Sequence, residues 1–533
     1  MMENYQPLSP SASVDLTRRS SSAEGNHARK RPRNHSHTME SRFEDPGQFD
    51  TTLVPSVTYN FVGNEFVLSK TKTWTKVHDP SSQTFITRVP DSTPVEVQHA
   101  VAEASNAQHA WAEVPLAKRR SLMLNLLMVI YQHSAKIRHT LCVEVGKTLA
   151  DADAEFKRGV DALETACTTI NDGVGIHFQH NAAEIHTMTQ PLGVCVAICP
   201  FNFPFLIPLW SVPYAILAGN TVVLKPSEQT PSAPQILAEC FLRAGFPPGV
   251  FNMVHGGAGV VNSLLSQQAV RAINFVGSEV AGERIYEHAT ATRKRIQAEC
   301  SAKNHGVVLE DASKTKTLYA IAGSAFGAAG QRCMALSVII LVGETREWLD
   351  DLISLAESLA VGCGLDPVVD MGPLISPASK NRVKKVIANA EKEGAKIALD
   401  GRKRVVADYP DGNFLGPTIL TNVKPYMSCY QEEIFGPVLC CIEIDTLEEA
   451  IELINANRYG NGCTIFTNSP ASAQVFQRSV NVGQVGVNVP ILAPSGPILR
   501  TGNKDSFLGD QNPHGRTPWQ FYTTTKTITS LWH

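Results

Sequence analysis

Apolar side chains recur with a spacing near 3.6 residues in three stretches of the first third of the chain. This period predicts amphipathic helices over residues 95–112, 116–137 and 148–171. Arg158 falls away from the apolar stripe of the third stretch, as a solvated helix cation does.

Short apolar runs then replace the helical period. Helical stretches separate these runs, and the alternation is typical of a parallel sheet with crossover helices. The predicted strands are 193–199, 221–224, 251–254 and 272–276, and the intervening helices include 232–244 and 258–266. Such a sheet binds ligands outside the carboxyl ends of its strands, so the loops after these strands are candidates for a site.

A second alternation follows residues 294–299 and predicts a second α/β domain, with Cys333 between the two. Its predicted strands are 306–309, 336–342, 438–444 and 464–466, and its helices include 314–329 and 346–360. Near the C-terminus, residues 520–529 alternate like a strand and are predicted to pair with residues 183–189. Two such exposed edges suit contacts between subunits.

Residues 1–52 are rich in Ser, Arg, His and Asn and poor in large apolar side chains, which predicts a disordered tail. Within it, residues 29–33 (RKRPR) are either a nuclear localisation patch or ordinary solvated charge. The tail contains arginines but also acidic residues, so it does not match a mitochondrial presequence and its role in targeting stays open.

Composition changes this picture little, because 43% apolar and 18% charged residues are typical of a soluble globular protein. The net charge of -3 argues against nucleic acid as a partner. The twelve cysteines show no zinc-type spacing and a chain of 533 residues does not need disulfides, so we expect reduced thiols in an intracellular compartment and no secretion signal. The uncharged run 191–224 contains several prolines, which argues against a membrane span.

Cys333 is the candidate nucleophile. It follows small residues and the pair Gln331-Arg332 in the segment FGAAGQRCMA, where the backbone can approach closely and a cation lies beside the thiol. Taken alone, a cysteine is more often a small buried apolar residue. Asn202 lies between two prolines after the first strand, where its amide can donate to an oxyanion or simply form a turn.

Three further side chains follow predicted strands in positions that suit a dinucleotide. Lys225 can meet phosphate or ribose, and Glu228 can accept hydrogen bonds from ribose hydroxyls. Ser278 opens a helix in the segment GSEVAG, which would place pyrophosphate at a helix N-terminus. Alone, this two-glycine turn is weaker evidence than the full three-glycine fingerprint.

The motifs PFNFP, LKPSE, FVGS, GQRC and EIFGP, in this order, resemble those of the aldehyde dehydrogenase superfamily from about residue 59 to the C-terminus. Within it, the chain is most similar to the CoA-acylating methylmalonate-semialdehyde dehydrogenases. The segments that carry this second resemblance are 302–306, 326–335, 483–490, 506–510 and 525–532.

The resemblance implies an α/β fold of several parts. These are a Rossmann-type cofactor domain (53–178 and 191–300), a second α/β catalytic domain (301–495), and a small β oligomerisation element with a C-terminal arm (179–190 and 496–533). It further implies a homodimer or homotetramer that acts on a small-molecule aldehyde. By family analogy we expect the protein in mitochondria, with the cytoplasm as the alternative.

The resemblance also implies a chemistry. Cys333 would attack the aldehyde carbon, with the oxyanion held by the Asn202 amide and the Cys333 backbone N–H. Arg158 and Arg332 would bind the carboxylate of a semialdehyde. CoA, as co-substrate, would release the resulting thioester, and loss of carbon dioxide would give propionyl-CoA or acetyl-CoA. NAD would be the cofactor, and the residues implied to bind it are Cys199, Phe201, Lys225, Glu228, Gln229, Ser278 and Glu433.

The chain departs from the acylating branch at Glu299, where that branch has asparagine. Hydrolytic aldehyde dehydrogenases have glutamate there as general base for water, so a hydrolytic NAD(P)-dependent enzyme is the alternative unless Glu299 points away or forms an ion pair. Gln229 replaces an arginine that contacts the cofactor, which leaves the choice of NAD or NADP open. The segment 491–504 also differs, and its Arg500 and Lys504 would affect which aldehyde is accepted.

A third hypothesis is a retired enzyme kept as a structural or binding protein, and the retained nucleophile and cofactor residues count against it. His255 and His305 are expected to be packed histidines, because the chemistry of the family needs no imidazole.

Overall fold

The structure, a computed structural model, describes residues 56–169, 175–181, 183–490, 502–510 and 517–532. The tail predicted as disordered (1–52), with its basic patch, lies outside the described residues. So does most of the divergent segment 491–504, including Arg500.

The first sheet has eight strands in the order β19-β11-β10-β7-β8-β9-β1-β2. Its middle strands run parallel, which confirms the predicted sheet with crossover helices. They are β7 (Val194–Ile198), β8 (Thr221–Lys225), β9 (Phe251–Met253), β10 (Val270–Val276) and β11 (Arg295–Glu299). The edges are antiparallel and consist of β1 (Asn60–Val62), β2 (Glu65–Val67) and β19 (Phe507–Leu508). Because the middle strands are buried on both faces, they read as continuous apolar runs rather than as alternating ones.

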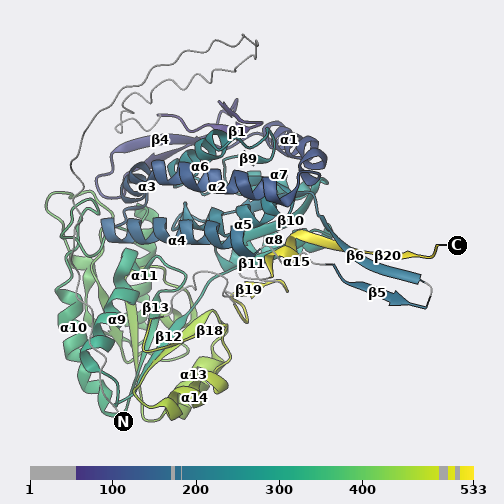
Figure 1. Cartoon of the computed structure of the whole chain (residues 1–533). Coiled ribbons are helices and arrows are strands. Elements are labelled where there is room, and N and C mark those ends of the chain that lie inside the picture. Colours follow the sequence, from purple (N-terminus) through teal and green to yellow (C-terminus); the bar gives the residue numbers. More distant parts are fainter. Residues whose placement is uncertain (1–55, 170–174, 182, 491–501, 511–516, 533) are drawn as a thin grey trace, which may run out of the picture. The chain divides into compact units, whose positions relative to one another are not determined.

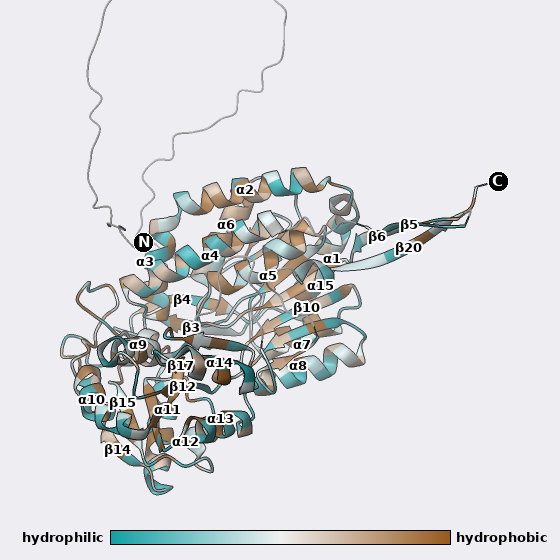
Figure 2. Ribbon diagram, turned by 60° about the horizontal axis from the view of Figure 1, so that its bottom comes forward, coloured by the Kyte–Doolittle hydropathy of each residue, from teal (hydrophilic) through white to brown (hydrophobic). Residues whose placement is uncertain are grey.

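Helices cover both faces of the first sheet (Figures 1 and 2). One face packs against α2 (Leu116–Gln132), α4 (Leu149–Thr169), α5 (Leu206–Leu217) and α6 (Ser232–Arg243). The other packs against α1 (Pro94–Ala112), α7 (Ala258–Ser266) and α8 (Glu279–Ala291). Helix α5 is buried along its whole length and is predominantly brown, the hydrophobic colour, in Figure 2.

The prediction of a single helix over residues 116–137 is wrong, because the structure has two helices there. Helix α2 ends at Gln132 and α3 (Ser134–Thr140) begins one residue later. The break falls at His133, whose ring Nδ1 lies 2.9 Å from the Val129 carbonyl oxygen. A side chain bound to the last turn of its own helix is a local contact that apolar periodicity does not detect.

The second sheet has seven strands in the order β14-β15-β16-β13-β12-β17-β18, and all but β14 run parallel. Its strands are β12 (Asn304–Val308), β13 (Leu336–Val342), β14 (Lys396–Leu399), β15 (Thr418–Thr421), β16 (Val438–Ile444), β17 (Gly462–Phe466) and β18 (Gln484–Val487). The helices that pack with it include α9 (Lys314–Phe326), α10 (Leu349–Glu357), α11 (Pro377–Lys392), α13 (Leu447–Ala456) and α14 (Pro470–Ser479). The second predicted alternation of strands and helices is therefore present.

Two predicted helices of this region are too long. Helix α9 ends at Phe326 rather than at residue 329, and a left-handed turn follows it. The helix predicted from residue 346 begins only at Leu349, after a 3-10 turn (Gly343–Trp348).

The chain passes from β11 of the first sheet to β12 of the second through residues 300–303, because β11 ends at Glu299 and β12 begins at Asn304. The carboxyl edge of the first sheet therefore meets the amino edge of the second. Loops from both edges converge there.

A third sheet contains β5 (His177–His180), β6 (Ala183–Pro191) and β20 (Thr523–Ser530) in the order β20-β6-β5. Strand β20 pairs antiparallel with β6, from Thr523 opposite Pro191 to Ser530 opposite Glu184, which confirms the predicted pairing. Figure 1 shows this sheet extending away from the helices of the first sheet.

In the part of the chain that the structure describes, no helix combines the length and apolar character that crossing a membrane requires. The uncharged run 191–224 instead forms β7, α5 and most of β8.

Candidate active site

Cys333 lies in the loop before β13, and its backbone is fixed by two asparagines. The Cys333 carbonyl accepts hydrogen bonds from Asn304 Nδ2 at 2.8 Å and from Asn461 Nδ2 at 3.0 Å. Asn304 begins β12 and Asn461 immediately precedes β17, so both amides come from the amino edge of the second sheet. The Asn304 amide also donates to the Ala335 carbonyl at 2.9 Å. The thiol is thus presented on a backbone held from two neighbouring strands.

A strained turn precedes the cysteine. Ala328 and Ala329 have φ values of 50° and 52°, a left-handed conformation that costs roughly 1–2 kcal/mol per non-glycine residue. Gly330 follows with φ of 70°, and a Cβ there would lie 2.2 Å from the Gly436 carbonyl oxygen. Only glycine permits this approach, which brings the cysteine loop against the loop that contains Glu433.

Surrounding contacts hold this turn in place. Asp151 accepts a hydrogen bond from the Ala328 N–H at 3.1 Å. The Gln331 amide donates to the Pro373 carbonyl at 3.3 Å, and its Oε1 accepts from the Ile375 N–H at 3.0 Å. The Gln331 side chain therefore holds the backbone of the cysteine loop against the segment 373–375.

Cys333 borders a pocket of about 400 Å³. Arg158 and Arg332 line the same pocket, so the structure brings together the proposed nucleophile and both arginines predicted to bind a carboxylate. Phe203, Leu206 and Trp210 are among its apolar lining residues. Gly159 allows this arrangement, because a Cβ there would come within 2.6 Å of the Phe205 ring and would push α4 away from the start of α5.

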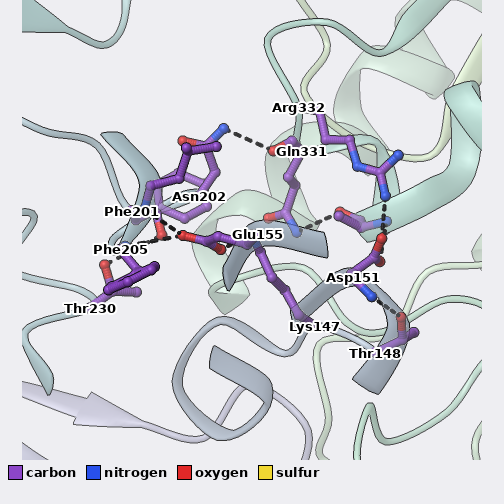
Figure 3. A network of polar contacts seen from close by, with 12 residues as sticks. Lys147, Thr148, Asp151, Glu155, Phe201, Asn202, Phe205, Thr230, Gln331 and Arg332 are labelled. Atoms are coloured by element: carbon purple, nitrogen blue, oxygen red, sulfur yellow. Dashed lines mark hydrogen bonds and ion pairs between the residues drawn. The ribbon is translucent and has the colours of Figure 1, made fainter. Parts of the chain in front are cut away.

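Two ion pairs lie at the pocket wall (Figure 3). Lys147 pairs with Glu155 and Arg332 pairs with Asp151. The Lys147 ammonium is buried, sits 3.9 Å from the centre of the Phe203 ring, and has its pKa lowered by burial. The other Glu155 oxygen accepts from the N–H groups of Phe205 and Leu206 at 3.0 and 3.1 Å and so caps the N-terminus of α5.

Asn202 is 4% exposed, and its Nδ2 donates to the Gln331 carbonyl at 3.0 Å (Figure 3). This contact places the amide two residues before Cys333. Asn202 lines a small neighbouring cavity together with Lys147 and Gln331. Among the described residues, the lining of the 400 Å³ pocket does not include it.

A second, narrower cavity meets Cys333 and is lined by Glu433, Ala302 and Phe435 among others. Glu433 Oε1 accepts from the Ala302 N–H at 3.0 Å. Burial raises the pKa of Glu433 to about 7, and hydrogen bonds from Ser301 and Ala302 oppose that rise. This carboxyl therefore changes charge near neutral pH.

The buried Lys303 ammonium fixes the Glu433 loop. It donates to the carbonyls of Cys429 at 2.6 Å and Glu432 at 2.8 Å. These bonds join the crossing 300–303 to the loop before β16, and burial lowers the pKa of Lys303.

The other predicted cofactor residues follow the carboxyl ends of β7 and β8. Cys199 is buried, and its N–H donates to the Lys225 carbonyl at 3.0 Å. The Lys225 ammonium lies 3.5 Å from the Glu228 carboxylate. Phe201 is half-buried, and its ring meets the edge of Phe435 at 5.9 Å between centroids, so it connects the two loops.

Two features test whether these loops fit a dinucleotide. Ser278 is exposed at the start of α8, and its side chain forms no capping bond to that helix. The buried Oε1 of Gln229 has no hydrogen-bond partner in the part of the chain that the structure describes. A helix N-terminus, an ammonium and an unpartnered acceptor at one sheet edge fit the phosphates and hydroxyls of NAD.

Glu299 ends β11 and is 7% exposed. Within the described residues, neither cavity at Cys333 has Glu299 in its lining. Lys504, which the sequence associates with the substrate, instead donates to the carbonyls of Asn455 at 3.0 Å and Asn457 at 2.9 Å. Lys504 thereby caps the C-terminus of α13.

His255 and His305 are packed histidines, as predicted. Both are buried, and burial lowers the pKa of each to about 3. His305 Nε2 lies 3.1 Å from the Tyr430 hydroxyl.

Sequence reasoning missed several residues that build the site. They are Lys147, Asp151, Glu155, Asn304 and Asn461. Only Asn304 lay inside a motif that had been singled out, the segment 302–306. The other four contact the site from segments far away along the chain.

Comparison with known proteins decides the family. The model of the aldehyde dehydrogenase family matches residues 66–528. The chain belongs to the aldehyde dehydrogenase family. Among solved aldehyde dehydrogenases, the NAD+ complex from Bacillus cereus superposes with a TM-score of 0.85 at 27% identity, covering 89% of this chain and 96% of that one.

Within the family, the chain is similar to methylmalonate-semialdehyde/malonate-semialdehyde dehydrogenases [acylating], mitochondrial. It is 46% identical to the one from Homo sapiens over 484 residues, 90% of each chain. It is 45% identical to the one from Bos taurus over 496 residues, 93% of this chain and 92% of the relative. The methylmalonate-semialdehyde dehydrogenase structure from Oceanimonas doudoroffii has a TM-score of 0.88 at 35% identity, covering 90% of this chain and 99% of that one.

Proposed function

We propose that this aldehyde dehydrogenase oxidises methylmalonate or malonate semialdehyde with NAD and transfers the acyl group to CoA. The observation that carries the proposal is the single pocket lined by Cys333, Arg158 and Arg332. Guanidinium groups beside a nucleophile suit an aldehyde that also has a carboxylate. The similarity to the acylating relatives supports the same substrate class.

Cys333 is proposed to attack the aldehyde carbon as a thiolate, so that the aldehyde oxygen becomes an oxyanion. An amide has two N–H groups, and one Asn202 N–H is bound to the Gln331 carbonyl. The second Asn202 N–H and the Cys333 backbone N–H are proposed to stabilise the oxyanion. NAD, when bound, supplies the acceptor for the hydride that leaves the substrate carbon. A thioester to Cys333 results.

The CoA thiolate is proposed to attack the thioester carbon and to release the Cys333 sulfur as a thiolate. The malonyl-type CoA ester then loses carbon dioxide, which gives propionyl-CoA or acetyl-CoA. Arg158 and Arg332 are proposed to bind the substrate carboxylate, each contact being worth roughly 1.5–3 kcal/mol.

For the cofactor, we propose that Lys225 and Glu228 bind the adenosine ribose, that Ser278 and the first turn of α8 bind the pyrophosphate, and that Glu433 binds the nicotinamide ribose. The residues proposed to line the remaining cofactor surface are Cys199, Phe201 and Gln229.

A hydrolytic enzyme is the second candidate, because Glu299 has the carboxylate that a general base requires. Glu299 ends β11, next to the crossing 300–303 that contacts Glu433. Its absence from the described lining of both cavities at Cys333 favours CoA over water as the acyl acceptor.

The test is product identification by mass spectrometry with malonate semialdehyde and NAD, with and without CoA. The acylating proposal predicts that steady NADH formation requires CoA and yields acetyl-CoA. Steady turnover to a carboxylic acid without CoA would contradict it. In that case Glu299→Asn should stop acid release and leave only the first burst of NADH.

We propose the domain division 53–178 with 191–300, 301–495, and 179–190 with 496–533. Large apolar side chains exposed on the three-stranded sheet, including Phe178 and Met188, suit a contact with a second subunit. A homodimer or homotetramer is therefore proposed, and sedimentation equilibrium measures it.

The mitochondrial relatives suggest a mitochondrial protein, and cell fractionation distinguishes this from a cytoplasmic one.

A further inference from the structure

Asp151 occupies a central place in the substrate pocket. It lies in the first turn of α4 and lines the pocket together with Cys333. One carboxylate oxygen pairs with the Arg332 guanidinium, and the other accepts from the Ala328 N–H at 3.1 Å (Figure 3). The negative charge therefore lies beside the cation that is proposed to bind the substrate carboxylate.

Other contacts constrain Arg332 independently of Asp151. Its Nη1 also donates to the Gly323 carbonyl at 3.4 Å. The guanidinium lies against Gly327, where an added Cβ would come within 2.6 Å of Nη1. A variant without the Asp151 charge should therefore keep Arg332 near its place.

From this geometry we propose that Asp151 is a specificity-determining residue that competes with the substrate carboxylate for Arg332. The inference rests on the proposed function, in which Arg332 binds that carboxylate. A guanidinium has five N–H donors, so it can serve both anions at once, but the two negative charges repel each other. Asp151 thereby weakens the binding of anionic aldehydes and leaves neutral aldehydes almost unaffected.

The test compares Asp151→Asn with the unchanged enzyme on malonate semialdehyde and on propanal, a neutral aldehyde with the same number of carbons. We expect KM for malonate semialdehyde to fall about tenfold, because a nearby like charge is removed. We expect KM for propanal to change less than about twofold. Asp151→Ser, which is also uncharged and can still accept from Ala328, repeats the test if the Asn variant does not fold.

Asp153→Asn is the matched control. Asp153 is two residues further along the same helix, pairs with Lys157 and Arg138, and is absent from the described lining of the pocket. The Asp153→Asn variant should leave the KM values for malonate semialdehyde and for propanal unchanged.

An unchanged or higher KM for malonate semialdehyde in Asp151→Asn would overturn the proposal. So would an equal fall for both aldehydes. Arg332→Met separates this inference from the function beneath it, since a loss of semialdehyde affinity in that variant supports the carboxylate role of Arg332. If Arg332→Met leaves semialdehyde KM unchanged, the proposed carboxylate role of Arg332 fails. If only Asp151→Asn fails, the function stands.

Discussion

The two large sheets present opposite edges to the site. The first contributes the loops after its strands, with Asn202 after β7, Lys225 at the end of β8 and Ser278 after β10. The second contributes the loops before its strands, with Cys333 before β13 and Glu433 before β16. The proposed cofactor residues thus come mainly from carboxyl ends, and the proposed nucleophile comes from an amino edge.

The crossing 300–303 explains this difference. A chain that leaves the carboxyl end of β11 and enters β12 directly must bring the amino edge of the second sheet to the same place. Helix N-termini surround the first edge, and they suit an anionic cofactor. Side-chain amides surround the second edge and orient a backbone, as Asn304 and Asn461 do for Cys333. The proposed cofactor contacts and the proposed covalent step are thereby assigned mainly to different sheets.

The largest effect is expected for Cys333→Ala, which removes the nucleophile proposed for the second sheet. We expect loss of NADH formation by at least about 10⁴-fold, because the proposed covalent step requires the Cys333 sulfur. NAD affinity, measured by isothermal titration, should remain, since the proposed cofactor contacts come mainly from the first sheet.

Cys363→Ala is the control for this substitution, because Cys363 is the other half-buried cysteine of the described chain and lies outside both cavities at Cys333. A Cys333→Ala enzyme with substantial turnover would refute the assignment.

A smaller effect concerns Glu433, the proposed cofactor ligand that comes from the second sheet. Its pKa is raised to about 7, so lowering the pH through 7 neutralises it. A neutral carboxyl accepts weaker hydrogen bonds, and we expect KM for NAD to rise about fivefold below pH 7. The kinetics of NADH formation from pH 5.5 to 8.5 measure this rise, and Glu433→Gln should not show it.

The raised pKa of Glu433 also determines whether the free energy of unfolding rises or falls with pH. The ordinary pKa of an unfolded glutamate is about 4.3, so between that value and about 7 the folded protein retains a proton that the unfolded chain has lost. The contribution of Glu433 to the free energy of unfolding is therefore present at low pH and is lost as the pH rises to 7. Denaturant unfolding of the Glu433→Gln variant should show a weaker decline over this range. An identical decline would contradict the assignment.

The smallest effect is expected at a bridge between the sheets. Arg458, just before β17, pairs with Glu279 at the start of α8 and donates to Asp505 at 2.8 Å. Because the pair is partly exposed, Arg458→Ala should lower the free energy of unfolding by no more than about 1 kcal/mol, as measured with urea. KM for NAD should rise slightly, since α8 carries Ser278 at its first turn.

Arg346→Ala provides the comparison, because the pair Arg346–Asp445 joins elements of the second sheet region only. It should leave KM for NAD unchanged. Equal changes in that KM for both variants would show that the bridge has no role in joining the two edges.

Most of the fold was predictable because its signals are local. Buried parallel strands read as short apolar runs, and amphipathic helices repeat near 3.6 residues, so β7 to β10 and the helices α4, α6, α7 and α9 appear in the right order. Cys333, Asn202 and Glu433 were named from motifs only a few residues long. The predictions failed at His133 and after Phe326, where local bonds or a left-handed turn end a helix that apolar periodicity would continue.

The sequence by itself determined the family, the element order and the candidate for the nucleophile, since each of these depends on neighbours along the chain. Only the tertiary structure decided which charges meet at the pocket. Asp151 and Arg332 are 181 residues apart, and the amide of Asn461 reaches Cys333 across 128 residues. Such contacts arise because edges of two sheets meet at the site, and neither spacing nor composition encodes that meeting.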